Sequence, residues 1–119
     1  MHVRSIAFVA AVTALSASCA EATAQAPPVV TQRGVRFVLM RAEATSVAVA
    51  GSFNQWSASS HPLVQAKPGG MWTIVVPLPP GEHAFMYVVN GSEWVSPPLA
   101  EDYADDGFGA KNGIVVVRR

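Results

Sequence analysis

The amino-acid sequence predicts an all-β domain, a sandwich of short strands joined by frequent turns. The chain has 119 residues, which is enough for one domain. It contains 9 Pro and 9 Gly spread at short intervals, and these residues favour turns and interrupt regular structure. Between them, short segments alternate apolar and polar side chains with a period of two, and no segment after residue 34 has a helical period.

The alternation places a continuous apolar face on several of these segments. One face of the segment over 71–78 holds Trp72, Ile74, Val76 and Leu78, and one face of the segment over 82–89 holds Phe85, Tyr87 and Val89. Asn90-Gly91 is a strong signal for a hairpin turn, because both residues accept positive φ. Seven short strands in about 85 residues fit an immunoglobulin-like β-sandwich, with a small open barrel as the alternative. The expected strands are Val35–Arg41, Val47–Ala50, Leu63–Ala66, Met71–Leu78, Glu82–Val89, Trp94–Val95 and Ile114–Arg118.

The first 24 residues have the pattern of a secretory signal peptide. Arg4 gives a weakly basic start, residues 5–18 are uncharged and mostly apolar or small, and the alanines that follow offer cleavage sites. The apolar run is shorter than the roughly 20 residues that a membrane span needs. We therefore expect a signal peptide over 1–24, a disordered linker over 25–33 and a β domain over 34–119, exported to the periplasm or the medium.

Cys19 is the single cysteine of the chain, so it cannot form an intrachain disulfide. Two interpretations remain open. Cys19 could become the lipidated N-terminus of a lipoprotein, although Leu15 lies four positions before it, where a lipobox usually has its large apolar residue three before. The favoured interpretation is that Cys19 is removed with the signal peptide, which leaves a domain held together by packing alone.

Charge and motif content argue against several classes of function. The formal net charge is zero, so nothing points to nucleic acid or to an anionic membrane as a partner. His61 and His83 have no metal-ligand spacing, and we expect His61 to be solvated and His83 to be structural. Residues 101–106 hold the one carboxylate cluster, which is poorly placed for glycoside hydrolysis and is expected to be a solvated loop. We expect no enzymatic activity, no metal and no cofactor.

Four side chains are candidates for ligand contact. Trp56, Trp94 and Phe108 lie among Gly, Ser, Asn and Asp residues, where a core would not place large aromatic rings. Exposing such a ring to water costs burial energy of a few kcal/mol, which suggests a ligand with an apolar face and polar edges, such as a glucose ring. Asn112 could satisfy sugar hydroxyls. From spacing alone, each tryptophan is equally consistent with a lid over the core, and Asn112 with a turn residue.

Residues 47–56 read V-A-V-A-G-S-F-N-Q-W. This segment resembles the V-x-V-x-G-S/D-F-N-x-W signature of carbohydrate-binding module family 48, and in particular the glycogen-binding domain of AMP-activated protein kinase. Further matches follow in order, namely L-P-P-G-E-H over 78–83, Y-V-V-N-G over 87–91, Trp94, and D-D-G-F-G over 105–109 with Asn112. The resemblance covers roughly residues 34–119.

The resemblance implies an early-set, immunoglobulin-like sandwich that binds glycogen, starch or maltooligosaccharide without cleaving it. It implies that glucose rings stack on Trp56 and Trp94, that Phe108 takes the place of a bulky residue inserted into the curved glucan, and that Asn112 bonds hydroxyls. Met86 occupies a position where the family commonly has a lysine directed at the sugar. A thioether packs against a sugar but donates no hydrogen bond, a loss of about 0.5–1.5 kcal/mol.

The leading expectation is therefore an exported module that binds α-1,4-linked glucan. The alternative, favoured by Met86, is an exported protein-interaction module that keeps the fold and binds no sugar. Under the leading expectation, the five side chains converge on one exposed surface. Burial of both tryptophans in the core would argue against it.

Overall fold

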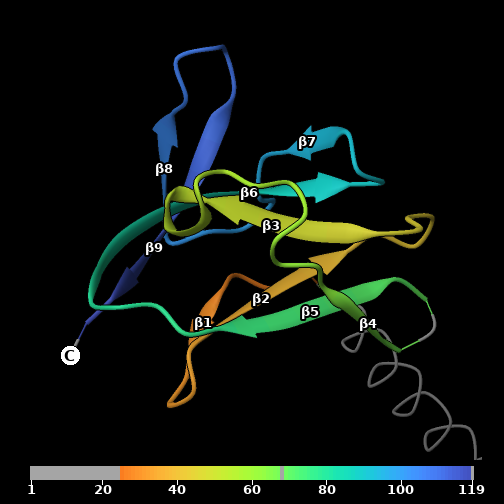
Figure 1. The fold of residues 1–119 in the computed structure, drawn as a ribbon, viewed down its shortest axis with the longest axis horizontal. Helices are drawn as coiled ribbons and strands as arrows, with labels where there is room; N and C mark the ends of the chain where they lie inside the picture. Colours follow the sequence, from red (N-terminus) through yellow and green to blue (C-terminus); the bar gives the residue numbers. More distant parts are fainter. Residues whose placement is uncertain (1–24, 68, 119) are drawn as a thin grey trace, which may run out of the picture.

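The computed structural model describes residues 25–67 and 69–118, which form two antiparallel sheets (Figure 1). One sheet has the strand order β1-β2-β5-β4, and the other has the order β3-β6-β9-β8, with β7 also paired to β6. A single 3₁₀ turn, η2 (Ser52–Asn54), follows β3 in the described part of the chain. The strands are β1 (Val29–Val30), β2 (Val35–Met40), β3 (Val47–Gly51), β4 (Val64–Lys67), β5 (Met71–Val76), β6 (Gly81–Val89), β7 (Glu93–Val95), β8 (Asp102–Asp105) and β9 (Lys111–Val117). The predicted all-β sandwich is confirmed.

Each strand expected from the sequence is present, with small differences at the ends. The strand expected over 71–78 stops at Val76, because Pro77 has no N–H to continue the ladder. The last strand begins at Lys111, three residues before the expected start, because its first residues pair with β8. The predicted signal peptide over 1–24, with Cys19, lies outside the described residues. Within the described ranges, no helix is long and apolar enough to cross a membrane.

Strand β8 corrects the expectation of a solvated loop over residues 101–106. Its backbone pairs with β9 from Asp102↔Ile114 to Asp105↔Lys111, while all of its side chains remain exposed. An edge strand of this kind is stabilised by backbone hydrogen bonds and can carry charge on both faces. The sequence therefore shows no apolar alternation there.

The segment before β2 corrects the expectation that residues 25–33 have no structure. Val29 and Val30 pair with the start of β2. Further back, the side-chain amide of Gln25 pairs with both backbone groups of Met40: Nε2 donates to the Met40 oxygen (3.1 Å), and Oε1 accepts from the Met40 N–H (3.0 Å). Because Pro27 and Pro28 have no N–H, a side-chain amide replaces the missing backbone pairing along this edge.

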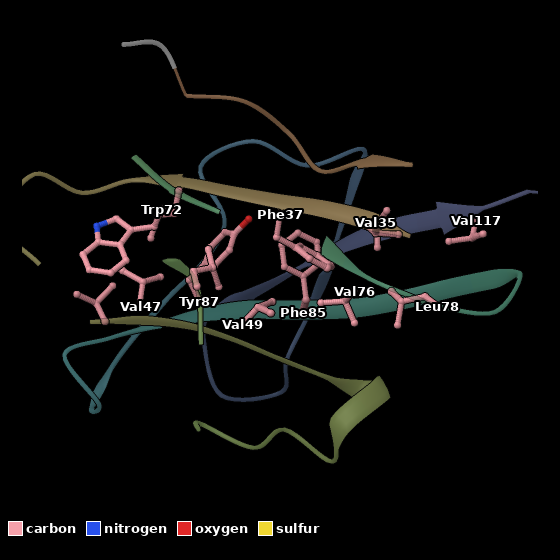
Figure 2. Close-up of a cluster of buried hydrophobic side chains, with 14 residues drawn as sticks. Val35, Phe37, Val47, Val49, Trp72, Val76, Leu78, Phe85, Tyr87 and Val117 are labelled. Atoms are coloured by element: carbon pink, nitrogen blue, oxygen red, sulfur yellow. The ribbon is translucent and has the colours of Figure 1, made fainter. Parts of the chain in front are cut away.

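The core lies between the sheets and is built from the apolar faces of β2, β3, β5, β6 and β9 (Figure 2). Three aromatic rings form its centre. The Phe37 ring centroid lies 5.0 Å from that of Phe85, and the Phe85 centroid lies 5.6 Å from that of Tyr87, both edge to face. The inward faces expected for β5 and β6 are confirmed. With this face of β6 buried, its alternate residues must point away from the core.

Tyr87 connects the two sheets through a hydrogen bond. Its hydroxyl is buried and donates to the Val38 carbonyl oxygen on β2 (3.1 Å). Burial raises the pKa of this hydroxyl far above its usual value, so the group remains a donor. We expect Tyr87→Phe to lower the free energy of unfolding by about 1 kcal/mol, because the ring packing stays and one buried bond is lost. Urea denaturation measures this change, and an unaltered midpoint would show that the bond adds no stability.

Candidate functional site

The outward face of the β3-β6-β9-β8 sheet carries the candidate residues. Phe85 and Tyr87 of β6 face the core, so Met86 and Val88 face outward. Trp94 pairs with Val88 across the β6–β7 ladder and shares its face. On β9, Val115 and Val117 face the core, so Asn112 also lies on the outward side.

A fork between strands opens a groove on this face. β6 pairs with β9 as far as Phe85↔Gly113 and then pairs with β7 from Tyr87↔Val95 onward. Met86 lies at the fork, where the two partner strands diverge, and only 6% of its surface is exposed. Met86 therefore forms the floor of the groove, and residues from the surrounding loops and strands form its walls.

The groove has a volume of about 370 Å³. Its lining comes from the loop after η2, β6, β7, the β8–β9 loop and β9, which are far apart in the sequence. The structure thus brings together all five residues expected to lie on one surface and adds one carboxylate that the sequence did not single out. The lining residues are Trp56, Met86, Trp94, Asp106, Phe108 and Asn112.

The aromatic side chains of the groove are accessible to a ligand. Phe108 is 93% exposed and Trp94 is 44% exposed, and Trp56 is partly exposed. The core holds Trp72 instead, whose indole Nε1–H donates to the Arg41 carbonyl oxygen (3.2 Å). Exposed aromatic rings gathered around one hollow mark an interaction site more strongly than scattered ones.

Trp56 is held in an unusual backbone conformation. Gln55 and Trp56 have φ values of 56° and 57°, in the left-handed region, which costs about 1–3 kcal/mol for each residue without a glycine. The Trp56 N–H donates to the Gly51 carbonyl oxygen (2.9 Å) and closes the turn. Gly51 itself has no room for a side chain, because a Cβ there would lie 2.5 Å from the Ala84 carbonyl oxygen.

Asn54 fixes this loop from within. Its Oδ1 accepts from the backbone N–H groups of Gly51 (3.0 Å) and Ser57 (3.2 Å), and its Nδ2 donates to the Val49 carbonyl oxygen (3.1 Å). Nδ2 also lies 2.8 Å from Nδ1 of His61. His61 is thus a partner of Asn54 and packs edge to face on Phe53, which corrects the expectation that it is simply solvated. Motif spacing did not reveal the role of Asn54, because that role depends on backbone partners.

Trp94 is carried by an anchored hairpin. Asn90 and Gly91 have φ values of 55° and 79°, which confirms the predicted turn. Asn90 Oδ1 accepts from the Thr45 N–H (2.8 Å), the Thr45 hydroxyl (2.9 Å) and the Ser46 N–H (3.3 Å). Beside Trp94, the Glu93 carboxylate pairs with Arg41 at 2.7 Å. These contacts hold the turn between β6 and β7 at its first and last residues.

Phe108 stands at the tip of the β8–β9 hairpin, which rises above the sheets in Figure 1. Its neighbours Gly107 and Gly109 have φ values of 87° and 95°, which most other residues avoid. Asp106 Oδ1 accepts from the N–H groups of Phe108 (2.7 Å) and Ala110 (3.1 Å). The loop therefore presents a phenyl ring to solvent from a hydrogen-bonded turn.

The chemistry of the groove suits a ligand with apolar faces and hydroxyl-rich edges. Three aromatic rings and a thioether supply contact area, while one carboxamide and one carboxylate supply polar contacts. Among the lining residues there is a single carboxylate, whereas glycoside hydrolysis uses two held across the sugar. The arrangement thus offers stacking surfaces and hydrogen-bonding groups that match the faces and edges of a sugar ring.

Comparison with known proteins gives a family match over most of the domain. A family model described as the glycogen recognition site of AMP-activated protein kinase matches residues 36–119. The 1,4-alpha-glucan branching enzyme GlgB of Pseudomonas syringae pv. syringae (strain B728a) is 40% identical over 72 residues, which are 60% of this chain and 10% of the enzyme. GlgB of Burkholderia vietnamiensis (strain G4 / LMG 22486) is 43% identical over 51 residues, which are 42% of this chain and 7% of the enzyme. GlgB 1 of Xanthomonas campestris pv. campestris (strain 8004) is 37% identical over 71 residues, which are 59% of this chain and 10% of the enzyme. The chain thus spans at most about a tenth of the length of these relatives.

Proposed function

The chain belongs to the family of the glycogen recognition site of AMP-activated protein kinase, and we propose that it binds α-1,4-linked glucan in the groove without cleaving it. The proposal rests on one observation. Trp56, Trp94 and Phe108 come from separate loops and strands, and all three line the same open groove. Glucose rings would stack on the two indoles, with Phe108 packed against the chain and Asn112 bonded to hydroxyls.

Preorganisation supports a binding role. Trp56 and Phe108 lie on loops whose turns are fixed by internal hydrogen bonds, and Trp94 lies on β7, close to the Asn90 turn that is bonded to Thr45. A ligand would therefore lose little affinity to ordering the site. The floor residue Met86 offers no donor, so we expect affinity up to about tenfold below that of a site with one more hydrogen bond there.

Affinity electrophoresis tests the proposal directly. The protein is run through native gels with and without glycogen or amylopectin, and through a gel with dextran as a control polymer of different linkage. We expect retardation by the α-1,4-linked polymers and little by dextran. Equal migration of the protein in all of these gels would contradict the proposal.

A protein-interaction module is the second candidate function. It is favoured by two observations: Met86 lacks a donor at the floor of the groove, and Phe108 exposes 93% of its surface, as an anchor for another protein would. This function predicts unretarded migration in the glucan gels. It also predicts that Phe108→Ala weakens capture of a partner from the native host, whereas retention by glycogen would favour the first function.

We also propose that the protein is exported, on the strength of the signal-peptide pattern over residues 1–24. Mass spectrometry of the N-terminus of protein recovered from the native host tests this. Export predicts cleavage after one of residues 20–26, and therefore an N-terminus within residues 21–27, in the periplasm or the medium. An acylated N-terminal Cys19 would instead establish the lipoprotein alternative, and an intact residue 1 on cytosolic protein would exclude both.

A further inference from the structure

Asp106 differs from the other residues of the groove because it is the one charged residue in the lining. It is also part of the loop that carries Phe108. One carboxylate oxygen, Oδ1, accepts from the N–H groups of Phe108 (2.7 Å) and Ala110 (3.1 Å), and the Asp106 N–H donates to the Ala110 carbonyl oxygen (3.1 Å). The carboxylate is thereby fixed at the edge of the groove.

The second carboxylate oxygen, Oδ2, has no hydrogen bond within the described part of the chain. Because Asp106 lines the groove, this oxygen is available to accept from a hydroxyl of a bound sugar. A hydrogen bond to an ionised acceptor is shorter and stronger than one between neutral groups. Asp106 can therefore supply polar contact that the thioether of Met86 does not.

No basic side chain lines the groove to balance this charge. Lys111 precedes Asn112 in the chain, but its ammonium group pairs with Asp105 at 2.8 Å, outside the groove. The hydrogen bond and charge of Lys111 lower the pKa of Asp105, and Asp105 in turn raises the pKa of Lys111, as expected for a mutual pair. The groove is thus left with the negative charge of Asp106.

We infer that Asp106 makes the groove selective for neutral glucan over glucan that carries phosphate monoesters, and that the same carboxylate positions Phe108. The inference rests on the proposed function and specifies its ligand. A phosphate monoester carries about −1.5 to −2 charges at neutral pH. Within several ångströms of a carboxylate at a partly exposed site, the repulsion weakens binding by about tenfold or more.

The test compares maltoheptaose with maltoheptaose that carries a phosphate monoester, titrated calorimetrically into the protein at low ionic strength. We expect the wild-type protein to bind the neutral sugar at least about tenfold more tightly. Added salt should shrink this preference, because it screens exposed charges. Binding of both sugars with equal affinity would overturn the inference.

Two substitutions separate the charge from the positioning role. Asp106→Asn keeps an oxygen for the Phe108 and Ala110 N–H groups but removes the charge. The affinity ratio between neutral and phosphorylated sugar should therefore fall toward one, while neutral-sugar affinity falls only in part, because a neutral acceptor replaces an ionised one. Asp106→Ala removes both, so affinity for the neutral sugar should also fall, by about tenfold. Thermal unfolding of each variant confirms that it folds.

Asp102→Asn is the matched control. It removes the same charge from the exposed strand β8, outside the groove, and should leave the preference unchanged. An unchanged preference in Asp106→Asn, or wild-type affinity for maltoheptaose in Asp106→Ala, would overturn the inference while the proposed function stands. Failure of the wild-type protein to bind either sugar would overturn the proposed function and this inference together.

Discussion

Trp56→Ala and Trp94→Ala are each expected to reduce glucan affinity by about 30-fold or more, which removes detectable retardation in glycogen gels. Each change deletes one wall of the groove and the apolar surface that a glucose ring would cover. Truncation of an aromatic anchor at the centre of a binding site to alanine typically weakens binding by at least about 2 kcal/mol. Titration calorimetry with maltoheptaose measures the loss in each variant.

Leu99→Ala is the matched control for this prediction. Leu99 exposes 44% of its surface, the same share as Trp94, but it does not line the groove. Its removal should leave glucan affinity unchanged. Wild-type affinity in Trp94→Ala, or an equal loss in Leu99→Ala, would contradict the assignment of the groove as the sugar site.

Asn54→Ala is expected to have the largest effect on stability among polar substitutions at the site. The side chain is buried and contacts Gly51, Ser57, Val49 and His61. Its removal leaves the buried Gly51 N–H and Val49 carbonyl oxygen without this partner, together with two partly buried groups. Each unpaired buried group costs about 1–3 kcal/mol, so we expect a loss of roughly 3 kcal/mol in the free energy of unfolding. Urea denaturation gives the value.

The same substitution should weaken glucan binding even in protein that remains folded. Two left-handed residues, Gln55 and Trp56, depend on the loop that Asn54 holds together. Ser57→Ala serves as the control, because within residues 25–67 and 69–118 the Ser57 hydroxyl bonds only to exposed Ser59 and Ser60. If Asn54→Ala unfolds at the wild-type midpoint, Asn54 does not stabilise the loop as described.

Most of the sandwich could be predicted because apolar alternation identifies strands that bury one face. The segments 71–76 and 82–89 each place large apolar residues at alternate positions, and the structure packs these faces against the core; in β6, residues 85–89 are buried on both faces. β1 and β8 were missed because both lie at sheet edges and pair through the backbone alone, without an apolar face to give a period. The side-chain pairing of Gln25 with Met40 likewise has no pattern in the sequence.

The candidate site was predictable in its aromatic residues but not in its polar framework. Trp56, Trp94 and Phe108 were predictable because large rings lie among Gly, Ser, Asn and Asp residues, and the family resemblance implies a role for each. Asp106 and Asn54 act through backbone N–H groups of their own loops, and such contacts depend on turn geometry that spacing does not reveal. Both residues lie in segments that carry the family resemblance, 47–56 and 105–109, but the resemblance assigned them no role. Aspartate and asparagine in short glycine-containing loops are a further signal that could have identified them.

The indole Nε1–H signals of the three tryptophans offer the most direct test of glucan binding in the groove. In a ¹⁵N-labelled sample titrated with maltoheptaose, we expect the Trp56 and Trp94 signals to shift and saturate together. The Trp72 signal should stay in place, because its indole is buried and bonded to Arg41. If neither the Trp56 nor the Trp94 signal moves at millimolar sugar, the groove is not a glucan-binding site.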